Sequence, residues 1–265
     1  MRTALLIKTW RDHWRSLLAW ALGLAAMAAV QLSVYPSIAA SSADMDAMLK
    51  NWPDVFQGMF SFEDYTTGAG FLNVELFSMI VPLVLVAVGV GWGASATADE
   101  ERNGTADILL TLPISRTSVI VTKMLAAVGA LAALALVTAA VIAIGGPLVD
   151  IDIAFGTLLR ACFGSALLGL LFGAVAFLIA AVTGKRGVAK GAAIGLALGS
   201  FLVKSLSSMV DSFDAINPAN PFTWALQGNP LVNPLLPSSA GWLALTSLVL
   251  SVGAVFAFRR RDISS

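Results

Sequence analysis

The sequence predicts an all-α membrane protein with six transmembrane helices, and three observations carry this prediction. Hydrophobic residues make up 58% of the 265 residues and charged residues only 12%, whereas a soluble domain is about half apolar and about a quarter charged. The apolar residues gather in six long runs, and most lysines and arginines lie in alternate connections between those runs. The formal net charge is zero, so the chain offers no basic field for a nucleic-acid partner.

The six apolar runs each come close to or exceed the length of a membrane span. A helix that crosses a lipid bilayer needs about 20 mainly apolar residues. Because unpaired backbone groups are costly in hydrocarbon, each run should be helical. Together they predict one transmembrane domain over residues 1–265. The runs cover approximately residues 17–35, 74–98, 119–144, 155–182, 187–209 and 241–258.

Positive charge predicts the orientation, because loops on the cytoplasmic side of a membrane are enriched in lysine and arginine. Six spans place both termini on one side, and segments on that side hold thirteen of the sixteen lysines and arginines. The other side clearly holds Lys50, with Arg160 and Lys204 near span ends. We therefore expect both termini to be cytoplasmic. The opposite segments are acidic, with Asp44, Asp46, Asp54, Glu63, Asp64, Asp150, Asp152, Asp211 and Asp214.

Residues 1–16 predict an amphipathic elbow helix at the membrane surface. Lys8, Arg11, Asp12 and Arg15 share one face of a helix, and apolar residues with two tryptophans take another, which is typical of an interfacial helix. The helix either anchors the first span or also touches a cytoplasmic partner. His13 is expected to be a surface residue. A cleaved signal peptide is the alternative, but the run over 17–35 is long for its apolar region.

The most polar stretch between two spans is "DEERNGTADILLTLPISR", within residues 98–117. The helix of the second span should continue through Glu100 and Glu101 and stop at Gly104, since glycine tolerates the left-handed conformation of a helix end. Thr105 can cap a second, short helix, whose first turn holds Asp107. Leu109 and Leu110 lie within this helix, Pro113 ends it, and the third span begins near Arg116.

The pattern Glu-x-x-x-Gly-Thr-x-Asp-x-Leu-Leu-x-x-Pro-x-Ser-Arg resembles a motif of the type-2 ABC transporter permeases. In that family the stretch follows the second span and forms the coupling helix. Six spans in about 265 residues, an elbow helix and a long outer segment before the last span are also similar to the family. The resemblance covers the whole chain in outline, but only these roughly 17 residues are specific.

The resemblance implies a half-transporter. Two copies of the permease, as a homodimer or with a related chain, would join two ABC-type ATPase subunits. Glu100 and Arg116 would be docking or hinge-fixing ion partners, with Glu101 and Asp107 beside them. Gly104 and Pro113 would form the turns, and Leu109 with Leu110 would form the apolar contact. ATP and magnesium would then bind to the ATPase.

The chain itself shows no nucleotide site and no catalytic set. Gly184-Lys185 lacks the earlier glycine of a phosphate-binding loop, and "GVGWG" at 89–93 follows no predicted strand, as a dinucleotide site would require. One histidine and one cysteine, Cys162, cannot form an internal disulfide or a usual protein-only zinc site. We therefore predict a transport subunit that is not an enzyme and contains no cofactor or metal of its own.

Two sets of glycines recur every fourth residue. Gly191, Gly195 and Gly199 follow Gly187 in the fifth run, and Gly169 and Gly173 lie in the fourth. Such stripes let helix backbones approach closely. We expect packing within the subunit, with a sliding surface near a dimer seam or the transport route as the alternative.

Charged residues beside spans are candidates for the transport route. Glu75 lies at the start of the second span, Arg160 within the fourth, and Lys204 near the outer end of the fifth. Snorkelling of long side chains toward headgroups is the simpler explanation. The middle of each span is almost wholly apolar, which favours a hydrophobic or amphipathic substrate.

Both long outer segments predict short helices. Residues 36–73 carry apolar residues at helical spacing, between Met48 and Phe60. Residues 210–239 carry four Asn-Pro pairs, at which helices should break, and "FTWALQG" between them allows one or two helical turns. Type-2 permeases similarly have short re-entrant helices before the last span.

The sequence thus favours the permease subunit of an ATP-driven exporter in a bacterial plasma membrane. Its substrate would be a hydrophobic or amphipathic small molecule, such as an antibiotic. The same architecture could instead serve maturation of an exported metalloenzyme, or lipid or ion export. A membrane scaffold or sensor without an ATPase is the alternative from another class. An intramembrane enzyme is disfavoured, because reactive side chains are scarce.

Overall fold

The structure is a computed structural model, and it describes residues 2–42, 65–102, 116–207, 210–227, 229–233 and 235–260. Within these residues, six helices are long and apolar enough to cross a membrane, which confirms the predicted fold class. These helices are α1 (Arg2–Ala40), α5 (Ile80–Arg102), α7 (Arg116–Gly145), α8 (Phe155–Thr183), α9 (Arg186–Leu206) and α12 (Pro237–Arg260).

Short helical elements connect the spans. Before α5 come α4 (Gly68–Leu72) and the π-helix η1 (Asn73–Phe77), and the 3₁₀-helix η2 (Gly146–Val149) follows α7. Between α9 and α12 lie α10 (Asp211–Ile216), the 3₁₀-helix η3 (Asn217–Ala219) and α11 (Pro221–Leu226). The expected short helices of residues 210–239 are therefore present.

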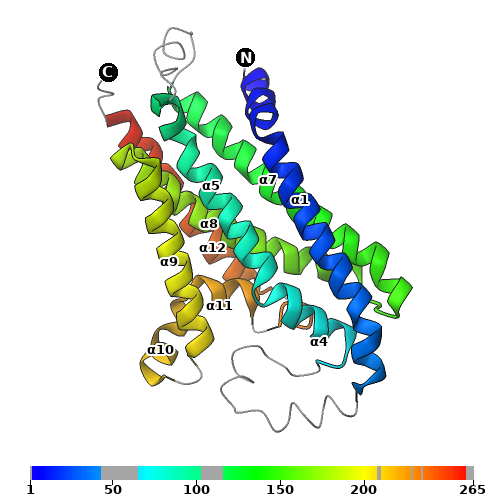
Figure 1. Cartoon of the computed structure of the whole chain (residues 1–265). Helices are drawn as coiled ribbons and strands as arrows, with labels where there is room; N and C mark the ends of the chain where they lie inside the picture. The colour runs from blue at the N-terminus through cyan, green and yellow to red at the C-terminus, as the bar shows by residue number, and fades with distance from the viewer. Residues whose placement is uncertain are drawn as a thin grey trace.

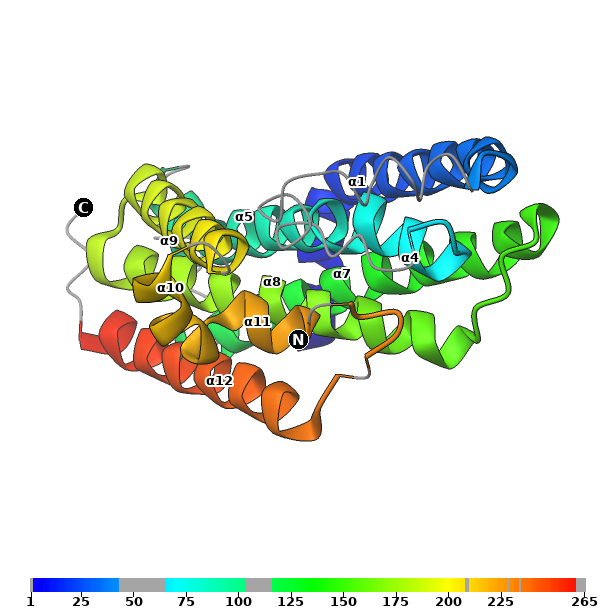
Figure 2. The same ribbon diagram turned by 90° about the horizontal axis from the view of Figure 1, so that it is seen from below.

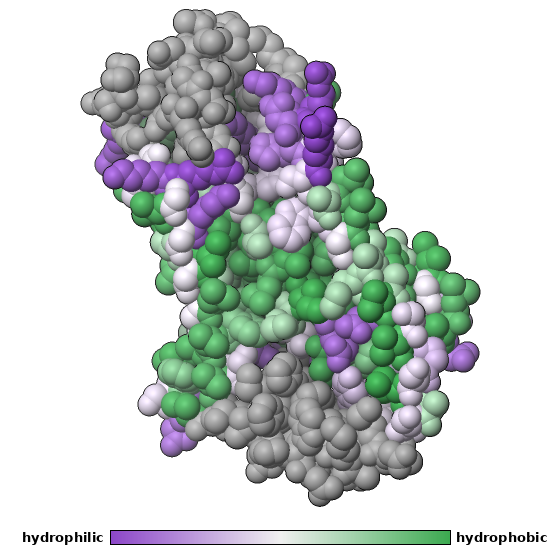
Figure 3. All heavy atoms as spheres, in the orientation of Figure 1, coloured by the Kyte–Doolittle hydropathy of each residue, from purple (hydrophilic) through white to green (hydrophobic). Residues whose placement is uncertain are grey.

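The two ends of the helix bundle differ in charge. The start of α1, the end of α12 and the α8–α9 turn gather at one end, here called the N/C end, while α4, α10 and α11 lie toward the other, here called the distal end (Figure 1). Hydrophobic atoms cover the middle of the molecule, and hydrophilic atoms gather toward the N/C end (Figure 3). Basic residues near the N/C end include Lys8, Arg11, Arg15, Lys185, Arg186, Arg259 and Arg260.

The predicted elbow and first span form one helix, which corrects the expectation of two elements. α1 runs from Arg2 to Ala40 without interruption and contains Pro36 near its end. The first turns are nevertheless set at an angle to the rest of α1 (Figures 1 and 2). Trp10 and Leu17 pack against the core, while Trp14 is half exposed. Since the charged face of these turns is also exposed, the first part of α1 has the amphipathic exposure that the sequence predicts.

The helices α5 and α8 form the centre of the bundle. They are the most buried of the six spans, and α8 contacts α5, α7, α9 and α12. α1 packs on α7, while α9 and α12 pack on α8, and α12 lies on the side of α8 away from α1 (Figure 2). The outer spans α1, α9 and α12 leave most of their surface exposed, as helices in contact with lipid or another subunit do.

The short helix α11 returns into the distal half of the bundle. The carbonyl oxygen of Ala225 lies 2.7 Å from the point where Gly164 would carry a Cβ. Gly164 follows the distal start of α8 by nine residues, or about 14 Å along a helix. Asn220 holds α11 in place, because its side chain caps α11 at Phe222 and donates to the carbonyl oxygen of Ser200 in α9. α11 is thus re-entrant, as expected.

Candidate functional site

The helices α5 and α7 lead into and out of the 98–117 segment. α5 extends to Arg102 and so includes Glu100 and Glu101, as predicted, and α7 begins at Arg116. Both helix ends lie side by side at the N/C end (Figure 1). The other predicted coupling residues lie outside the described residues, and these are Gly104, Thr105, Asp107, Leu109, Leu110 and Pro113.

Side chains tie α5, α7 and the start of α1 together beside this segment. Lys123 of α7 donates a hydrogen bond from Nζ to the carbonyl oxygen of Ala96 in α5, at 3.0 Å. The His13 ring of α1 stacks at a tilt on Trp92 of α5, with ring centroids 4.7 Å apart. His13, expected to be a surface residue, is partly exposed, and its ring also packs on Trp92 of α5. A movement at the end of α5 or the start of α7 would therefore be transmitted to α1, α5 and α7.

Four glycines bring the backbones of α5 and α8 into direct contact. A Cβ on Gly89 or Gly93 of α5 would fall on the carbonyl oxygen of Gly169 or Gly173 of α8, respectively. In the other direction, a Cβ on Gly169 would lie 2.6 Å from the carbonyl oxygen of Leu85. Only glycine permits this approach, so "GVGWG" serves helix packing, a role that the sequence analysis did not assign to it.

The glycines of α9 do not pack on other described parts of the subunit, contrary to the interpretation favoured from the sequence. Among the described residues, no atom lies within 4 Å of a Cβ built on Gly191, Gly195 or Gly199. The helix instead packs on the bundle through its alanines. These alanines are 2% exposed or less, and they are Ala189, Ala193 and Ala197. The glycine stripe therefore faces outward.

A carboxylate is held at the junction of α1 and the π-helix. Tyr65 donates from its hydroxyl to Oε1 of Glu75 at 2.8 Å, and Gln31 of α1 donates from Nε2 to Oε2 at 3.3 Å. Burial, and then the hydrogen bond and the charge of Glu75, raise the pKa of Tyr65. The hydroxyl thus keeps its proton at neutral pH and remains a donor. Glu75 is partly buried and accepts bonds from two separate segments.

The π-helix also contains a buried amide without a partner. Asn73 is fully buried, and neither its Oδ1 nor its Nδ2 forms a hydrogen bond with any residue that the structure describes. An unsatisfied buried polar group costs about 1–3 kcal/mol, and π-helical turns are frequent at functional sites. Asn73 and Glu75 therefore mark the start of the second span as a candidate site for transport.

The other two charged candidates lie on α8 and α9. Arg160 is exposed on α8 and donates from Nη2 to the hydroxyl of Thr157 at 3.1 Å. Lys204 lies in the last turn of α9 and is partly buried. Among the described residues, no ion pair or hydrogen bond joins Glu75, Arg160 and Lys204 to one another.

Hydroxyl groups inside the spans are mostly satisfied by their own helices. Thr138, Ser165 and Ser247 are each buried and donate to the carbonyl oxygen four residues earlier. Such hydroxyls offer little to a polar ligand, because their proton is already used within the helix. The described interior of the bundle therefore contains few polar residues, and most of its hydroxyl groups are not available to a ligand.

The comparison with protein families decides the class of protein. The family described as "ABC-2 family transporter protein" matches residues 3–263. The chain belongs to this family. An ABC-2 permease is the membrane transport subunit of an ABC transporter, and it works with an ABC ATPase. Such subunits are typically not catalytic themselves. No curated protein matches the chain.

The sequence did not predict the role of several polar residues of this ABC-2 permease. Lys123 was counted only as a cytoplasmic charge, and Gln31 and Asn73 lie unremarked within or beside apolar runs. Polar residues in an apolar run are a usable signal, because burial in a membrane is costly for an amide. Their partners could not be read from the sequence, since Gln31 and Glu75 are 44 residues apart.

Proposed function

We propose that the chain is the permease subunit of a bacterial exporter of hydrophobic or amphipathic small molecules, such as an antibiotic. Two copies of the separate ATPase bind ATP with magnesium and drive alternating access. The basic N/C end faces the cytoplasm, following the rule that positive charge stays inside. The described interior is apolar, and most of its hydroxyl groups are hydrogen-bonded within their own helices. Few polar groups therefore remain to bind a sugar or a free ion, which supports a substrate of low polarity.

The 98–117 segment is the coupling element in this proposal. The carrying observation is the direct backbone contact of α5 with α8 through Gly89, Gly93, Gly169 and Gly173. Because interfaces of this tightness transmit displacement, a push on the end of α5 moves α8 as well. The Lys123 bond to Ala96 adds α7 to the same unit. A small movement of the ATPase would thus reach three spans.

The second permease copy is proposed to meet this one at the outward glycine stripe of α9. The stripe presents bare backbone, which lets a second helix approach closely in a membrane. In a twofold-symmetric dimer, a residue near the axis meets its own copy. Gly195→Cys, in a Cys162→Ser background, should then form a disulfide-linked dimer under oxidation, whereas Ala244→Cys on α12 should not.

The coupling role is tested by Glu100→Ala in the full transporter. We expect the variant to insert normally but to lose most stimulation of ATP hydrolysis by substrate, or to lose the ATPase on purification. Asp152→Ala, an exposed acidic residue at the distal end, is the control and should behave as wild type. Wild-type stimulation and transport by Glu100→Ala would refute the proposal.

A further inference from the structure

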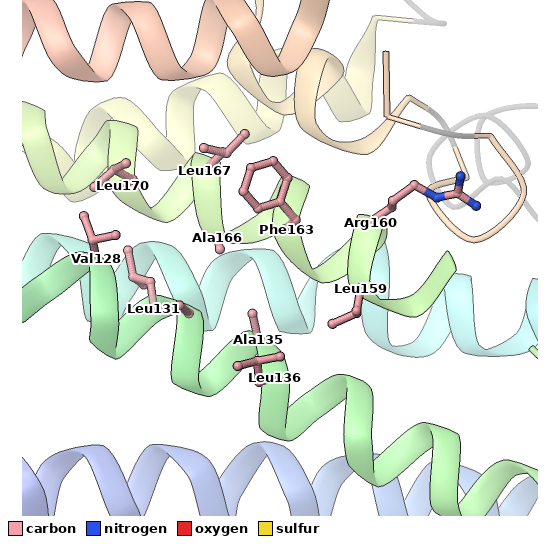
Figure 4. A pocket seen from close by; sticks show the side chains of 11 residues that line it. Val128, Leu131, Ala135, Leu136, Leu159, Arg160, Phe163, Ala166, Leu167 and Leu170 are labelled. Carbon is pink, nitrogen blue, oxygen red and sulfur yellow. The ribbon is translucent and has the colours of Figure 1, made fainter. Parts of the chain in front are cut away.

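A groove between α7 and α8 has a shape that fits a single lipid chain. Its volume is about 470 Å³, and all but one of its lining residues are apolar. The exception is Arg160, at the end where the two helices draw apart (Figure 4). The groove, here called the α7–α8 groove, is lined among others by Val128, Ala132, Leu136, Phe163 and Leu170.

The length of the groove corresponds to one leaflet of a bilayer. From Arg160 to Leu170 the α8 helix rises by about 15 Å, which is half of a hydrocarbon core about 30 Å thick. An acyl chain spans the hydrocarbon of one leaflet, so a single chain matches the groove in length.

Arg160 places a positive charge at one end of the groove (Figure 4). Its guanidinium points away from the apolar side chains of the groove, beyond its open end (Figure 4). One hydrogen bond goes to the neutral hydroxyl of Thr157, and no ion pair joins Arg160 to a carboxylate among the described residues. A guanidinium has five N–H donors and binds phosphate in a bidentate manner. It lies five residues after Phe155, the distal start of α8, where a long side chain reaches the headgroups.

The side chains along the groove already face outward from the bundle. Leu136 and Phe163 are each 53% exposed, and Val128 is 42% exposed. In a spanning helix such faces meet lipid rather than water. We propose that the α7–α8 groove is a binding site for one anionic phospholipid of the distal leaflet, with an acyl chain in the groove and the phosphate at Arg160. This site is separate from the proposed transport function and does not depend on it.

The test counts lipids that remain bound to the purified transporter, permease with ATPase, by native mass spectrometry. The probe is a vesicle of equal parts phosphatidylglycerol and phosphatidylcholine. We expect the wild type to prefer phosphatidylglycerol at one site per chain by about fivefold, the effect of one basic residue near a membrane surface. Arg160→Gln should remove the preference but keep the bound lipid.

A second variant tests the groove by filling it with a larger side chain. Ala132 is an exposed residue of the groove, so Ala132→Phe should fold normally and lose one bound lipid per chain. Ala244→Phe, at an exposed alanine of α12, is the matched control and should lose none. Three results would overturn the proposal: equal retention of both lipids by the wild type, displacement by inorganic phosphate, or a smaller oligomer in Ala132→Phe.

Discussion

Gly169→Ala should destabilise this permease, although alanine is the better helix former. The new Cβ would lie 2.6 Å from the carbonyl oxygen of Leu85, and ordinary contact begins at 3.4 Å, so α5 and α8 must move apart. Overpacking of this kind costs about 1–3 kcal/mol, while alanine in place of glycine gains about 1 kcal/mol of helix propensity. The net result is a loss of up to about 2 kcal/mol.

The control is Gly91→Ala in α5, where the new Cβ meets no described atom within 4 Å. This variant should show the helix gain alone, so the two variants should differ in free energy of unfolding by about 1–3 kcal/mol. Unfolding in detergent micelles, followed by tryptophan fluorescence during a dodecyl sulfate titration, measures the difference. Equal stability of the two variants would show that α5 and α8 are not in backbone contact.

Three further substitutions test other features of the structure. Asn73→Leu should raise the stability by about 1–3 kcal/mol, because it removes an unsatisfied buried amide; a lowered unfolding midpoint in the same titration would contradict the burial. The wild type should lose stability above pH 10.0, the ordinary pKa of tyrosine, because the folded state keeps the Tyr65 proton that the unfolded state releases. Tyr65→Phe should not show this loss. The same pH profile of unfolding in both proteins would argue against the burial of Tyr65 and its contact with Glu75. Lys123→Met should remove the hydrogen bond to Ala96, because methionine has no donor, and lower substrate-stimulated ATP hydrolysis, measured as phosphate release. Full stimulation would rule out a role for this bond in coupling.

The spans were predictable because their signal is local. Four of the six apolar runs became helices whose bounds lie within four residues of the expectation. The exceptions are α1, which joins the elbow to the first span, and α5, which begins six residues later than expected, after the π-helix. The amphipathic pattern of residues 1–16 cannot distinguish a separate helix from the first turns of a longer one, since both have the same period. The π-helix at Asn73–Phe77 was also hidden, because an apolar run does not reveal how its backbone is hydrogen-bonded.

Which small residues face the protein could not be predicted from spacing. In α9 the glycines and the alanines each recur every fourth residue, and Gly191 and Ala193 are two positions apart. Two positions correspond to about 200° around a helix, so the two stripes lie on opposite faces. Either stripe could have packed against α8, and only the bundle shows that Ala193 does. Likewise, the packing role of Gly89 depends on Gly169, which lies 80 residues later in the sequence.

The central claim is that the segment between α5 and α7 meets the ATPase on the cytoplasmic side. Thr105→Cys in a Cys162→Ser background gives the full transporter one thiol within this segment, provided that the ATPase is used in a cysteine-free form. A short cysteine-to-amine cross-linker applied to inside-out vesicles should join the permease to the ATPase, and an impermeant thiol reagent added to right-side-out vesicles should not label it. Labelling from the outside, with no cross-link to the ATPase, would contradict the account.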